Sequence, residues 1–220
     1  KEVLISSGSI ERPLVFGNND TPGVMLSSAA KEYLKVYGVL VGKKPLIFTN
    51  NDSGYETAIE FKKNGVDPII LDTRKEPKSE IIDEAKKLDI QIKFSYVVVA
   101  AKGYKKVKSA EVAKISEDKS ELGTLETINC DCICVSGFWT PTIHLASQSG
   151  NKTTFNKDID AFVPGLSKQN ETTLGAANGT FTLEETLKNS FDSGYELSKK
   201  ITNNDNKTSS PIVMEKKSTT

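Results

Sequence analysis

Two spacings of hydrophobic residues alternate along the chain, and their order predicts its secondary structure. A short apolar run over residues 45–48 is followed by turn-forming residues at 49–53, and a second apolar run over 68–71 ends at Asp72. Between the two runs, apolar side chains recur at helical spacing at Tyr55, Ala58 and Ile59. The order of strand, tight turn, helix and strand predicts a βαβ unit of the mononucleotide-binding type.

Helical spacing also marks three further segments. Residues 25–37 carry an apolar face that Gly38 would end, and residues 78–88 repeat the same spacing. A final helix of about four turns is expected after residue 182, on the apolar positions Leu183, Leu187, Phe191 and Leu197. Because strands and helices alternate, we expect an α/β protein with a parallel sheet.

From residue 91 onward the pattern is that of β-strands. Residues 91–115 hold β-prone apolar runs that are interrupted at Gly103 and followed by the polar stretch 116–120, which predicts a small antiparallel meander. Residues 125–135 predict one buried strand that runs into a glycine turn. Residues 153–162 predict a hairpin-like piece. An antiparallel part is therefore expected beside the parallel sheet.

Composition argues against several classes of function. Hydrophobic residues make up 37% of the 220 positions, enough for a sizeable core. Lys and Arg together number 29 and equal Asp and Glu at 29, so no overall charge favours nucleic acid or an anionic membrane as a partner. No apolar run approaches the roughly 20 residues of a membrane span, and no signal-peptide pattern is present, which predicts a soluble cytoplasmic protein. We expect residues 201–220 to form a polar tail.

The turn of the βαβ unit departs from the dinucleotide-binding fingerprint. That fingerprint, G-x-G-x-x-G, lets the backbone approach a pyrophosphate at the helix N-terminus, whereas residues 49–54 read Thr-Asn-Asn-Asp-Ser-Gly. Asn50 and Asn51 could donate hydrogen bonds to a phosphate. The favoured interpretation is helix capping, with Asp52 or Ser53 accepting from the first-turn amides.

Five further side chains have a chemical as well as a structural interpretation. Asp72 could accept a hydrogen bond from a ribose hydroxyl or be a solvated strand end, and both roles stay open. Cys130, Cys132 and Cys134 would point the same way from one strand, about 7 Å apart, and a buried row of thiols is favoured because zinc sites prefer C-x-x-C turns. His144 is the one histidine, and a structural role is favoured because no nucleophile motif lies near it. We assign no catalytic residue and no metal ligand.

Two glycine-bearing turns are better candidates for a ligand site. One follows the first strand, at residues 6–9, and the other precedes the last helix, at residues 175–179. Small residues let a backbone approach a ligand closely, and a helix N-terminus near residue 182 would offer free amides. One turn follows the first strand and the other precedes the last helix. Because of this order along the chain, we treat the two turns together as one candidate ligand site.

Several motifs are distinctive when taken together. They are GSIERPLVFGNNDTPGVML at residues 8–26, FTNNDS at 48–53, VSGFWTP at 135–141 with His144-Leu145 and Ser147-Gln-Ser-Gly150, FVPG at 162–165, and GAANG at 175–179. In these motifs, and from residue 2 to about residue 200, the sequence resembles the alpha subunit of heterotetrameric sarcosine oxidase. The resemblance is to a middle segment of that subunit, because its preceding glycine-rich half-domain and its following folate domain have no counterpart here.

The resemblance implies an oxidoreductase function. Members of the family demethylate sarcosine oxidatively to glycine, hydrogen peroxide and either formaldehyde or methylene-tetrahydrofolate. Their alpha subunit resembles a flavoprotein with two dinucleotide-binding domains and carries NAD, while FAD and FMN belong to the full complex and are not expected in this segment. The implied partners are the other subunits and, for the full subunit, tetrahydrofolate.

The resemblance also implies a domain arrangement and a site. Residues 1–40 and 125–200 would form part of a first dinucleotide-binding domain with its connector, and residues 41–124 a second, Rossmann-like βαβ domain with the antiparallel meander, inserted in the first. The residues expected nearest NAD are Ser7, Gly8, Ser9, Gly175, Ala176, Ala177 and Asn178.

Two hypotheses of different kinds follow. In the leading one, the chain is part of a sarcosine oxidase, inactive alone, and supports NAD binding and subunit assembly while oxidation takes place on a flavin held elsewhere. In the alternative, a degenerate Rossmann-like fold serves as a non-catalytic protein-interaction module. The fold alone cannot separate the two hypotheses, since one fold hosts many functions.

Overall fold

The computed structural model describes residues 1–202, 209 and 211–213. The chain forms two compact units: the first unit holds Lys1–Ile10 and the residues from Trp139 onward, and the second unit holds Glu11–Phe138. Most of the predicted polar tail, residues 201–220, lies outside the described residues. No helix in the described part of the chain is both long and apolar enough to cross a membrane.

The second unit is built on a parallel sheet. Within the described residues this sheet has five strands in the order β3-β10-β4-β5-β6, and every neighbouring pair is parallel. The strands are β3 (Val24–Leu26), β10 (Cys132–Ser136), β4 (Pro45–Thr49), β5 (Ile69–Asp72) and β6 (Gln91–Phe94). β4, α2 (Ser53–Lys63) and β5 follow one another in the chain, so the predicted βαβ unit is confirmed.

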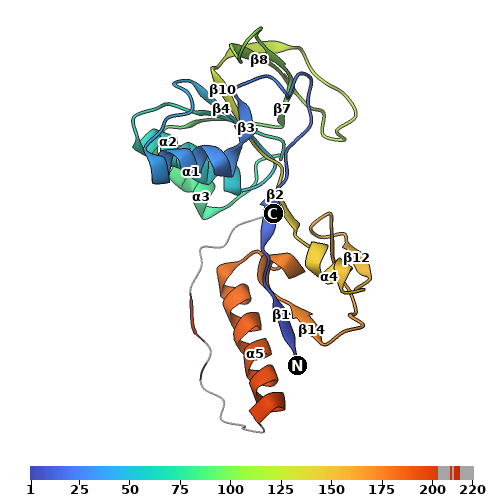
Figure 1. Ribbon diagram of the computed structural model, residues 1–220. Helices are drawn as coiled ribbons and strands as arrows, with labels where there is room; N and C mark the ends of the chain where they lie inside the picture. Colours follow the sequence, from blue (N-terminus) through green and yellow to red (C-terminus); the bar gives the residue numbers. More distant parts are fainter. Residues whose placement is uncertain (203–208, 210, 214–220) are drawn as a thin grey trace. The chain divides into compact units, whose positions relative to one another are not determined.

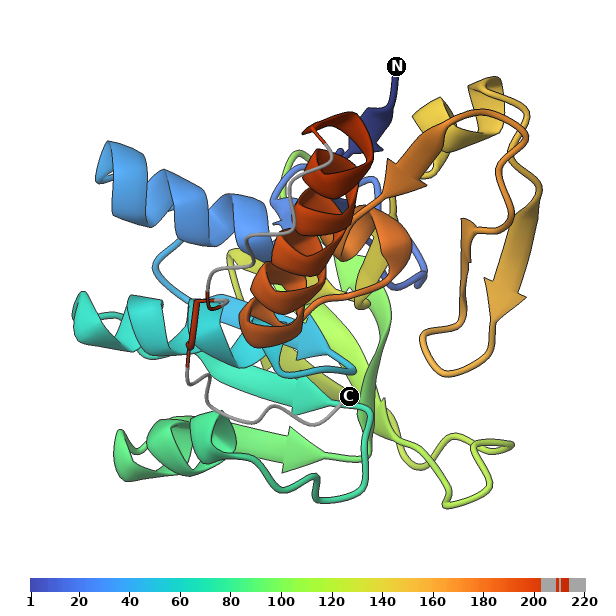
Figure 2. The same ribbon diagram turned by 90° about the horizontal axis from the view of Figure 1, so that it is seen from below.

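Three helices cover one face of this sheet. α1 (Ser27–Tyr37), α2 and α3 (Glu80–Lys87) lie in a row beside the strands (Figure 2). Their apolar faces meet alternate strand residues in one core, which includes Leu34, Tyr55, Phe61, Ile47 and Ile70. Burying an apolar stripe of this kind is what stabilises short helices in a folded protein. The helices predicted over residues 25–37 and 78–88 are confirmed to within two residues at each end.

An antiparallel meander contributes a second core in the same unit. β7 (Tyr96–Lys102), β8 (Ser109–Lys114) and β9 (Glu126–Asn129) pair in that order (Figure 1). Their inward residues pack with the other set of strand residues, including Leu46, Phe48, Leu71, Val98 and Val112. The meander was predicted, but residues 91–94 form β6 and belong to the parallel sheet instead.

The strand predicted over residues 125–135 is wrong as a single element. It is two strands, β9 in the meander and β10 in the parallel sheet, with a break between them. Asp131 lies in the break, and its two carboxylate oxygens accept hydrogen bonds from the backbone amides of Lys43 and Lys44 at 2.8 and 2.7 Å. Cys130 and Asp131 thus belong to neither strand, and the chain passes here from the meander to the parallel sheet.

The first unit is smaller and has less regular structure. β1 (Val3–Ile5) pairs in parallel with β14 (Glu171–Thr173), and the predicted hairpin is present as an antiparallel pair of β12 (Thr153–Asn156) and β13 (Ala161–Pro164). Its other elements are β2 (Ser9–Glu11), β11 (Trp139–Pro141), α4 (His144–Gln148), the short 3-10 helix η1 (Gly175–Asn178) and α5 (Leu183–Thr202). α5 is longer than the predicted four turns.

The boundaries of the two compact units differ from the domain boundaries that were predicted from the sequence. The contacts separate the chain after Ile10 and after Phe138, whereas residues 1–40 and 125–200 were expected together. α1 and β10 share a sheet and a core with β4, which places them in the second unit. The assignment of each unit to a first or second dinucleotide-binding domain stays a prediction.

Candidate functional site

The two predicted ligand turns leave neighbouring strands at the same end. β1 and β14 run in parallel with Ile5 opposite Thr173, and the backbone amide of Leu174 continues the ladder by donating to the carbonyl of Ile5 at 2.8 Å. Residues 6–9 follow β1 and residues 175–179 follow β14, so both turns start from the carboxyl edge of this strand pair. Ligands of open α/β sheets bind beyond that edge.

The turn after β1 is held in place by Thr142. The Ser7 hydroxyl donates to the carbonyl of Thr142 at 2.9 Å, the Thr142 hydroxyl donates to the carbonyl of Ser7 at 2.8 Å, and the Thr142 amide donates to Gly8 at 3.0 Å. Gly8 has a φ of +75° and open space where a side chain would project. Among the described residues, the amides of Ser7 and Gly8 and the hydroxyl of Ser9 donate to no partner. These three donors are available to a ligand.

The turn after β14 is a 3-10 helix with a buried side and an exposed tip. Gly175 has a φ of +62°, which strains any other residue, and a Cβ there would also crowd the Thr186 side chain at 3.1 Å. Ala177 is fully buried, whereas Asn178 is exposed. The Asn178 amide group forms no hydrogen bond with the rest of the described chain. The structure therefore brings Gly175 and Asn178 to the edge where Ser7, Gly8 and Ser9 lie.

At the start of the last helix, one of the amides that were expected to be free is capped by a side chain. The amide of Glu185 donates to the Thr182 hydroxyl at 3.4 Å, and that hydroxyl donates to a Glu185 carboxylate oxygen at 3.0 Å. Thr182 and Glu185 thus have the spacing of a capping box. Glu184 and Glu185 also place two acidic residues in the first turn, which already offset the helix dipole. A bound anion is disfavoured at this helix end.

In the second unit, the turn between β4 and α2 keeps one glycine of the fingerprint. Thr49 and Asn51 occupy the positions of the first two glycines, and Gly54 that of the third. A Cβ on Gly54 would lie 2.7 Å from the Cβ of Thr49, so glycine is needed for close packing of the helix on the strand, the role of the third glycine. The missing glycines are the one that allows the tight turn and the one that lets the backbone approach a pyrophosphate.

The polar residues of this turn bind one another. The Asn51 amide group donates to the carbonyl of Ser136 at 3.1 Å and to the Asn50 side chain at 2.9 Å. The Asn51 side-chain oxygen accepts from the amide of Ser53 at 2.9 Å. A side chain caps the start of α2, as predicted. The capping residue is Asn51, however, whereas Asp52 or Ser53 was expected. The Asp52 side chain makes no capping hydrogen bond because it pairs with Arg74 instead.

Both interpretations of Asp72 are wrong, because its carboxylate is fully buried in an ion-pair network. Asp72 accepts hydrogen bonds from the Tyr55 hydroxyl at 2.7 Å and from the Arg74 guanidinium at 2.9 to 3.2 Å. Arg74 also pairs with Asp52 at 2.8 Å. Burial and the nearby Asp72 charge raise the pKa of Tyr55 well above its ordinary value. Burial alone would lower the pKa of Arg74, but its bonds to Asp72 and Asp52 outweigh that effect and raise it.

Comparison with known proteins finds relatives that this chain matches over a small part of their length. No protein-family model matches it. A sarcosine oxidase subunit alpha from Rhizobium meliloti (strain 1021) is 38% identical over 187 residues, covering 81% of this chain and 17% of that protein. One from Corynebacterium sp. (strain P-1) is 33% identical over 188 residues, covering 84% of this chain and 19% of that protein. The chain is homologous to a segment of sarcosine oxidase alpha subunits. It spans less than a fifth of the length of these relatives.

Solved structures share the fold of this sarcosine oxidase alpha-type segment. Thioredoxin reductase from T. acidophilum matches with a TM-score of 0.65 and 17% identity, over 82% of this chain and 59% of that chain. The flavoprotein disulfide reductase RclA from Escherichia coli matches with a TM-score of 0.64 and 16% identity, over 91% and 44%. L-proline dehydrogenase from P. horikoshii matches with a TM-score of 0.60 and 20% identity, over 91% and 35%. The predicted Rossmann-like α/β fold is confirmed.

The cysteines of the segment do not form the predicted row. The break at Asp131 turns Cys130 into the core beside the meander, whereas Cys132 and Cys134 lie in the core beside the helices. All three are free thiols and buried. Burial raises the pKa of Cys130 to about 12, and a hydrogen bond with Cys132 together with burial raises that of Cys134. His144 is exposed at the start of α4.

Sequence reasoning missed the ion-pair network at the carboxyl edge of β4 and β5. Arg74 was not singled out, although it pairs with both Asp52 and Asp72. The signal was present, since Arg74 stands two residues after a strand-terminal Asp72, and Tyr55 lies one turn into the helix that faces it. A tyrosine and an arginine thus converge on one carboxylate, which is already hydrogen-bonded within the chain.

Proposed function

We propose that this chain is part of the alpha subunit of a sarcosine-oxidising enzyme and that its first unit binds NAD. The proposal rests on the relatives named above, which are sarcosine oxidase alpha subunits, and on the geometry of one edge. Because the chain spans only 17 to 19% of those relatives, the activity, substrate and partners of the whole protein belong to the proposal.

The single observation that carries the NAD assignment is the pairing of β1 with β14. This parallel pair places two glycine turns at one carboxyl edge, where dinucleotides bind in proteins of this fold. The amides of Ser7 and Gly8 would donate to the phosphate oxygens, because consecutive free amides form an anion-binding concavity. Ser9 and Asn178 would donate to or accept from the ribose and amide groups. The open space beside Gly8 leaves room for the close approach.

In the proposed arrangement the second unit supports the fold and holds no dinucleotide. A pyrophosphate at the β4–α2 turn would meet the side chains of Thr49 and Asn51, and the buried carboxylates of Asp52 and Asp72 are both paired with Arg74. The two carboxylates at this edge, those of Asp52 and Asp72, would also repel a phosphate. The polar groups present therefore do not fit a second cofactor.

The remaining chemistry of the proposed enzyme lies outside the residues described here. The chain would position NAD and contribute to assembly with the other subunits in the cytoplasm, while FAD and FMN of the complex oxidise the N-methyl group of sarcosine. Tetrahydrofolate would accept the one-carbon unit in the full subunit. No residue of this chain is assigned a proton-transfer or nucleophilic role.

The test is NAD binding by the full-length gene product with two matched substitutions. Asn178→Trp places an indole at the exposed tip of the proposed site, and Asn170→Trp places one on an exposed residue just before β14, at its other end. We expect Asn178→Trp to weaken NAD binding by at least about tenfold, or about 1.4 kcal/mol, and Asn170→Trp to leave it unchanged. Equal affinities for both variants and the unmodified protein would refute the assignment.

The alternative function, a protein-interaction module, is favoured by one observation in the second unit. The polar side chains at its β4–α2 turn bond one another, while the outer face of α1 exposes Tyr33, Val36 and Tyr37, at 47, 67 and 65%. Exposed aromatic clusters of this kind often mark contact surfaces. The NAD titration separates the two candidates, because an interaction module would not bind NAD in the full-length protein.

A further inference from the structure

Helix α1 carries apolar side chains on two faces. One face, which includes Ala30 and Leu34, packs into the core beside the parallel sheet. On the other face Tyr33, Val36 and Tyr37 are exposed, and because they lie three and four residues apart they form one stripe along the helix. A surface helix of a globular protein usually has one apolar face, and a helix that is apolar all round is usually buried. The exposed stripe is therefore a candidate contact surface.

The neighbouring helices have the ordinary pattern. α1 packs against α2 and α2 against α3, so α1 lies at one end of the row (Figure 2). Every exposed residue of α2 and α3 is charged: Glu56, Lys63, Glu80, Asp83, Lys86 and Lys87. Of the five exposed residues of α1, three are apolar or aromatic. The exposed stripe is thus a property of α1 and not of the helical layer.

The stripe extends past the end of the helix. Gly38 ends α1 in the left-handed conformation, with a φ of +65°, and its amide donates to the carbonyl of Leu34 at 3.1 Å. The amide of Val39 donates to the carbonyl of Tyr33 at 3.0 Å, and the two bonds together are the pattern of a Schellman motif. This motif folds Val39, which is 48% exposed, back towards Tyr33. We call Tyr33, Val36, Tyr37 and Val39 the α1 patch.

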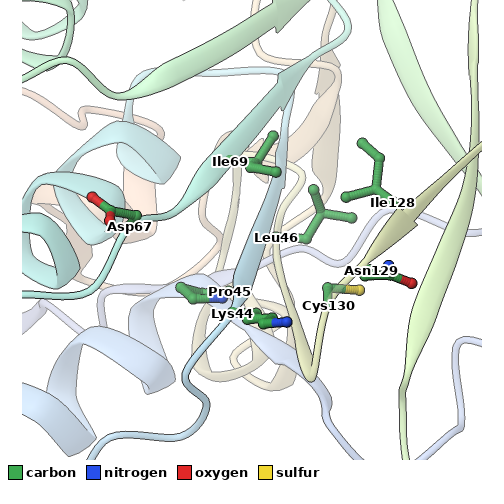
Figure 3. Close-up of a pocket in the computed structure, with 8 residues that line it drawn as sticks. All are labelled: Lys44, Pro45, Leu46, Asp67, Ile69, Ile128, Asn129 and Cys130. Atoms are coloured by element: carbon green, nitrogen blue, oxygen red, sulfur yellow. The ribbon is translucent and has the colours of Figure 1, made fainter.

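The α1 patch is hollowed by a groove of about 280 Å³, which is lined by Ala29, Glu32, Tyr33 and Tyr37. The Tyr33 and Tyr37 rings contact each other in a tilted arrangement, with their centroids 6.0 Å apart. Because both rings are exposed, a partner that covers them removes apolar surface from water. A hollow at the amino edge of β4 and β5, shown in Figure 3, is different, because Leu46 and Cys130 in its wall are already buried.

One carboxylate of the groove lacks a counter-ion within the described chain. The two lysines of α1 pair with α2, Lys31 with Glu56 at 2.5 Å and Lys35 with Glu60 at 3.7 Å. Glu32 is exposed and forms no ion pair with any described residue. A carboxylate beside two tyrosine rings suits a guanidinium group, which can donate two hydrogen bonds to the carboxylate and stack on an aromatic face.

We infer that the α1 patch docks on another subunit of the enzyme, at a surface that presents an arginine among apolar side chains. The arginine pairs with Glu32 and stacks on the exposed tyrosine rings, while the apolar side chains cover Val36 and Val39. Tyrosine anchors and a paired arginine are typical of the residues that dominate binding at protein interfaces. This inference rests on the assembly part of the proposed function and names the surface that is used.

Charge complementarity favours a different protein over a second copy of this chain as the partner. In a symmetric contact between two copies the same patch lies on both sides. Each Glu32 would then face a patch that offers it no free cation, because Lys31 and Lys35 are engaged with α2. A different subunit can supply the missing cation.

The test is hydroxyl-radical footprinting, in which exposed side chains are oxidised faster than covered ones. The full-length subunit is compared alone and in the complex purified with its other subunits. Tyr104, which is 92% exposed in the same unit and lies outside the α1 patch, is the internal reference. We expect Tyr33 and Tyr37 to be oxidised severalfold more slowly in the complex than in the subunit alone.

The other outcomes overturn the inference in distinguishable ways. Unchanged oxidation of Tyr33 and Tyr37 in a complex that does form would overturn it and leave the proposed assembly intact. Slow oxidation in the subunit alone would show that the remainder of its own chain covers the patch, or a second copy if the rate depends on concentration. If the full-length protein associates with no other subunit, the assembly part of the proposed function fails as well.

Two substitutions test the two chemical parts of the groove. Glu32→Lys reverses the charge that the arginine meets, and Tyr37→Ser removes one ring. We expect each to weaken association with the other subunit by about tenfold or more, and the effect of Glu32→Lys to shrink at about 1 M salt. Glu121→Lys and Tyr104→Ser are the matched controls, at exposed residues of the same unit outside the patch, and should leave association unchanged. Equal affinities for each variant and its control would contradict the inference.

Discussion

Replacing Arg74 with Ala should destabilise the second unit strongly, because it leaves the buried charge of Asp72 without its ion-pair partner. The Asp72 carboxylate is fully buried and would keep only the Tyr55 hydroxyl and the backbone amide of residue 74 as donors. Removing one partner of a buried ion pair costs about 3 to 5 kcal/mol. The Arg74 side chain is 16% exposed, so water reaches the gap and the lower end of the range applies, about 3 kcal/mol. For a unit of this size that corresponds to a melting temperature lower by about 10 °C.

The measurement is unfolding in urea, monitored by hydrogen exchange in peptides from β4 and β5. These peptides report on the second unit alone. Lys75→Ala is the matched control, because the neighbouring Lys75–Glu117 ion pair is 71 and 82% exposed, and water screens the attraction between its charges. Asp72→Asn combined with Arg74→Ala should be more stable than Arg74→Ala alone. If Arg74→Ala lowers the free energy of unfolding no more than Lys75→Ala does, the explanation by an unpaired buried charge is refuted. It is also refuted if the double variant is the least stable.

Three other predictions follow from the same structure. A thiol reagent should label less than one cysteine per native chain on average, because Cys130, Cys132 and Cys134 are all buried, and rapid labelling of two would contradict this. A chelator should not change the melting temperature, because these thiols are not expected to bind a metal. Calorimetric titration of the 220-residue chain alone should show NAD binding that is weak or absent, and micromolar affinity would overturn the expectation. Gly54→Ala should cost about 1 to 3 kcal/mol in chemical denaturation, because its Cβ would lie 2.7 Å from that of Thr49, and an unchanged midpoint would count against this close packing.

Local patterns were enough to predict most of the second unit. The apolar runs at residues 45–48 and 68–71 and the helical spacing between them became β4, α2 and β5, because parallel strands buried on both faces read as continuous apolar runs. The meander was also predicted. The error at residues 91–94 arose because a four-residue strand has the same pattern whether its neighbour is parallel or antiparallel.

Long-range pairing was beyond the sequence patterns. The break at Asp131 depends on amides almost 90 positions earlier, at Lys43 and Lys44, and a strand pattern of residues 125–135 carries no trace of them. The same limit applies to the site. The turns at residues 6–9 and 175–179 could be singled out for their small residues, but only the register of β1 with β14 brings them to one edge.

The ion-pair network at Asp72 shows why a motif alone is a weak guide to binding. The absence of two glycines at the β4–α2 turn suggested a changed function, and Asp72 still had the spacing of a ribose-binding residue. Whether that carboxylate was free depended on Arg74 and Tyr55, which reach it from the residues after β5 and from α2. Such a convergence is a property of the packed structure and has no fixed spacing in the sequence.

The central claim is that the edge formed by β1 and β14 is the dinucleotide site and that the crevice of the second unit is not. The most direct test is to map amide signals by nuclear magnetic resonance while NAD is added to the labelled chain at millimolar concentration, where weak binding is still visible. The account predicts shifts at Ser7, Gly8 and Asn178 and none at residues 49–53. Shifts at residues 49–53 and at Asp72, with none at Ser7 or Gly8, would contradict it.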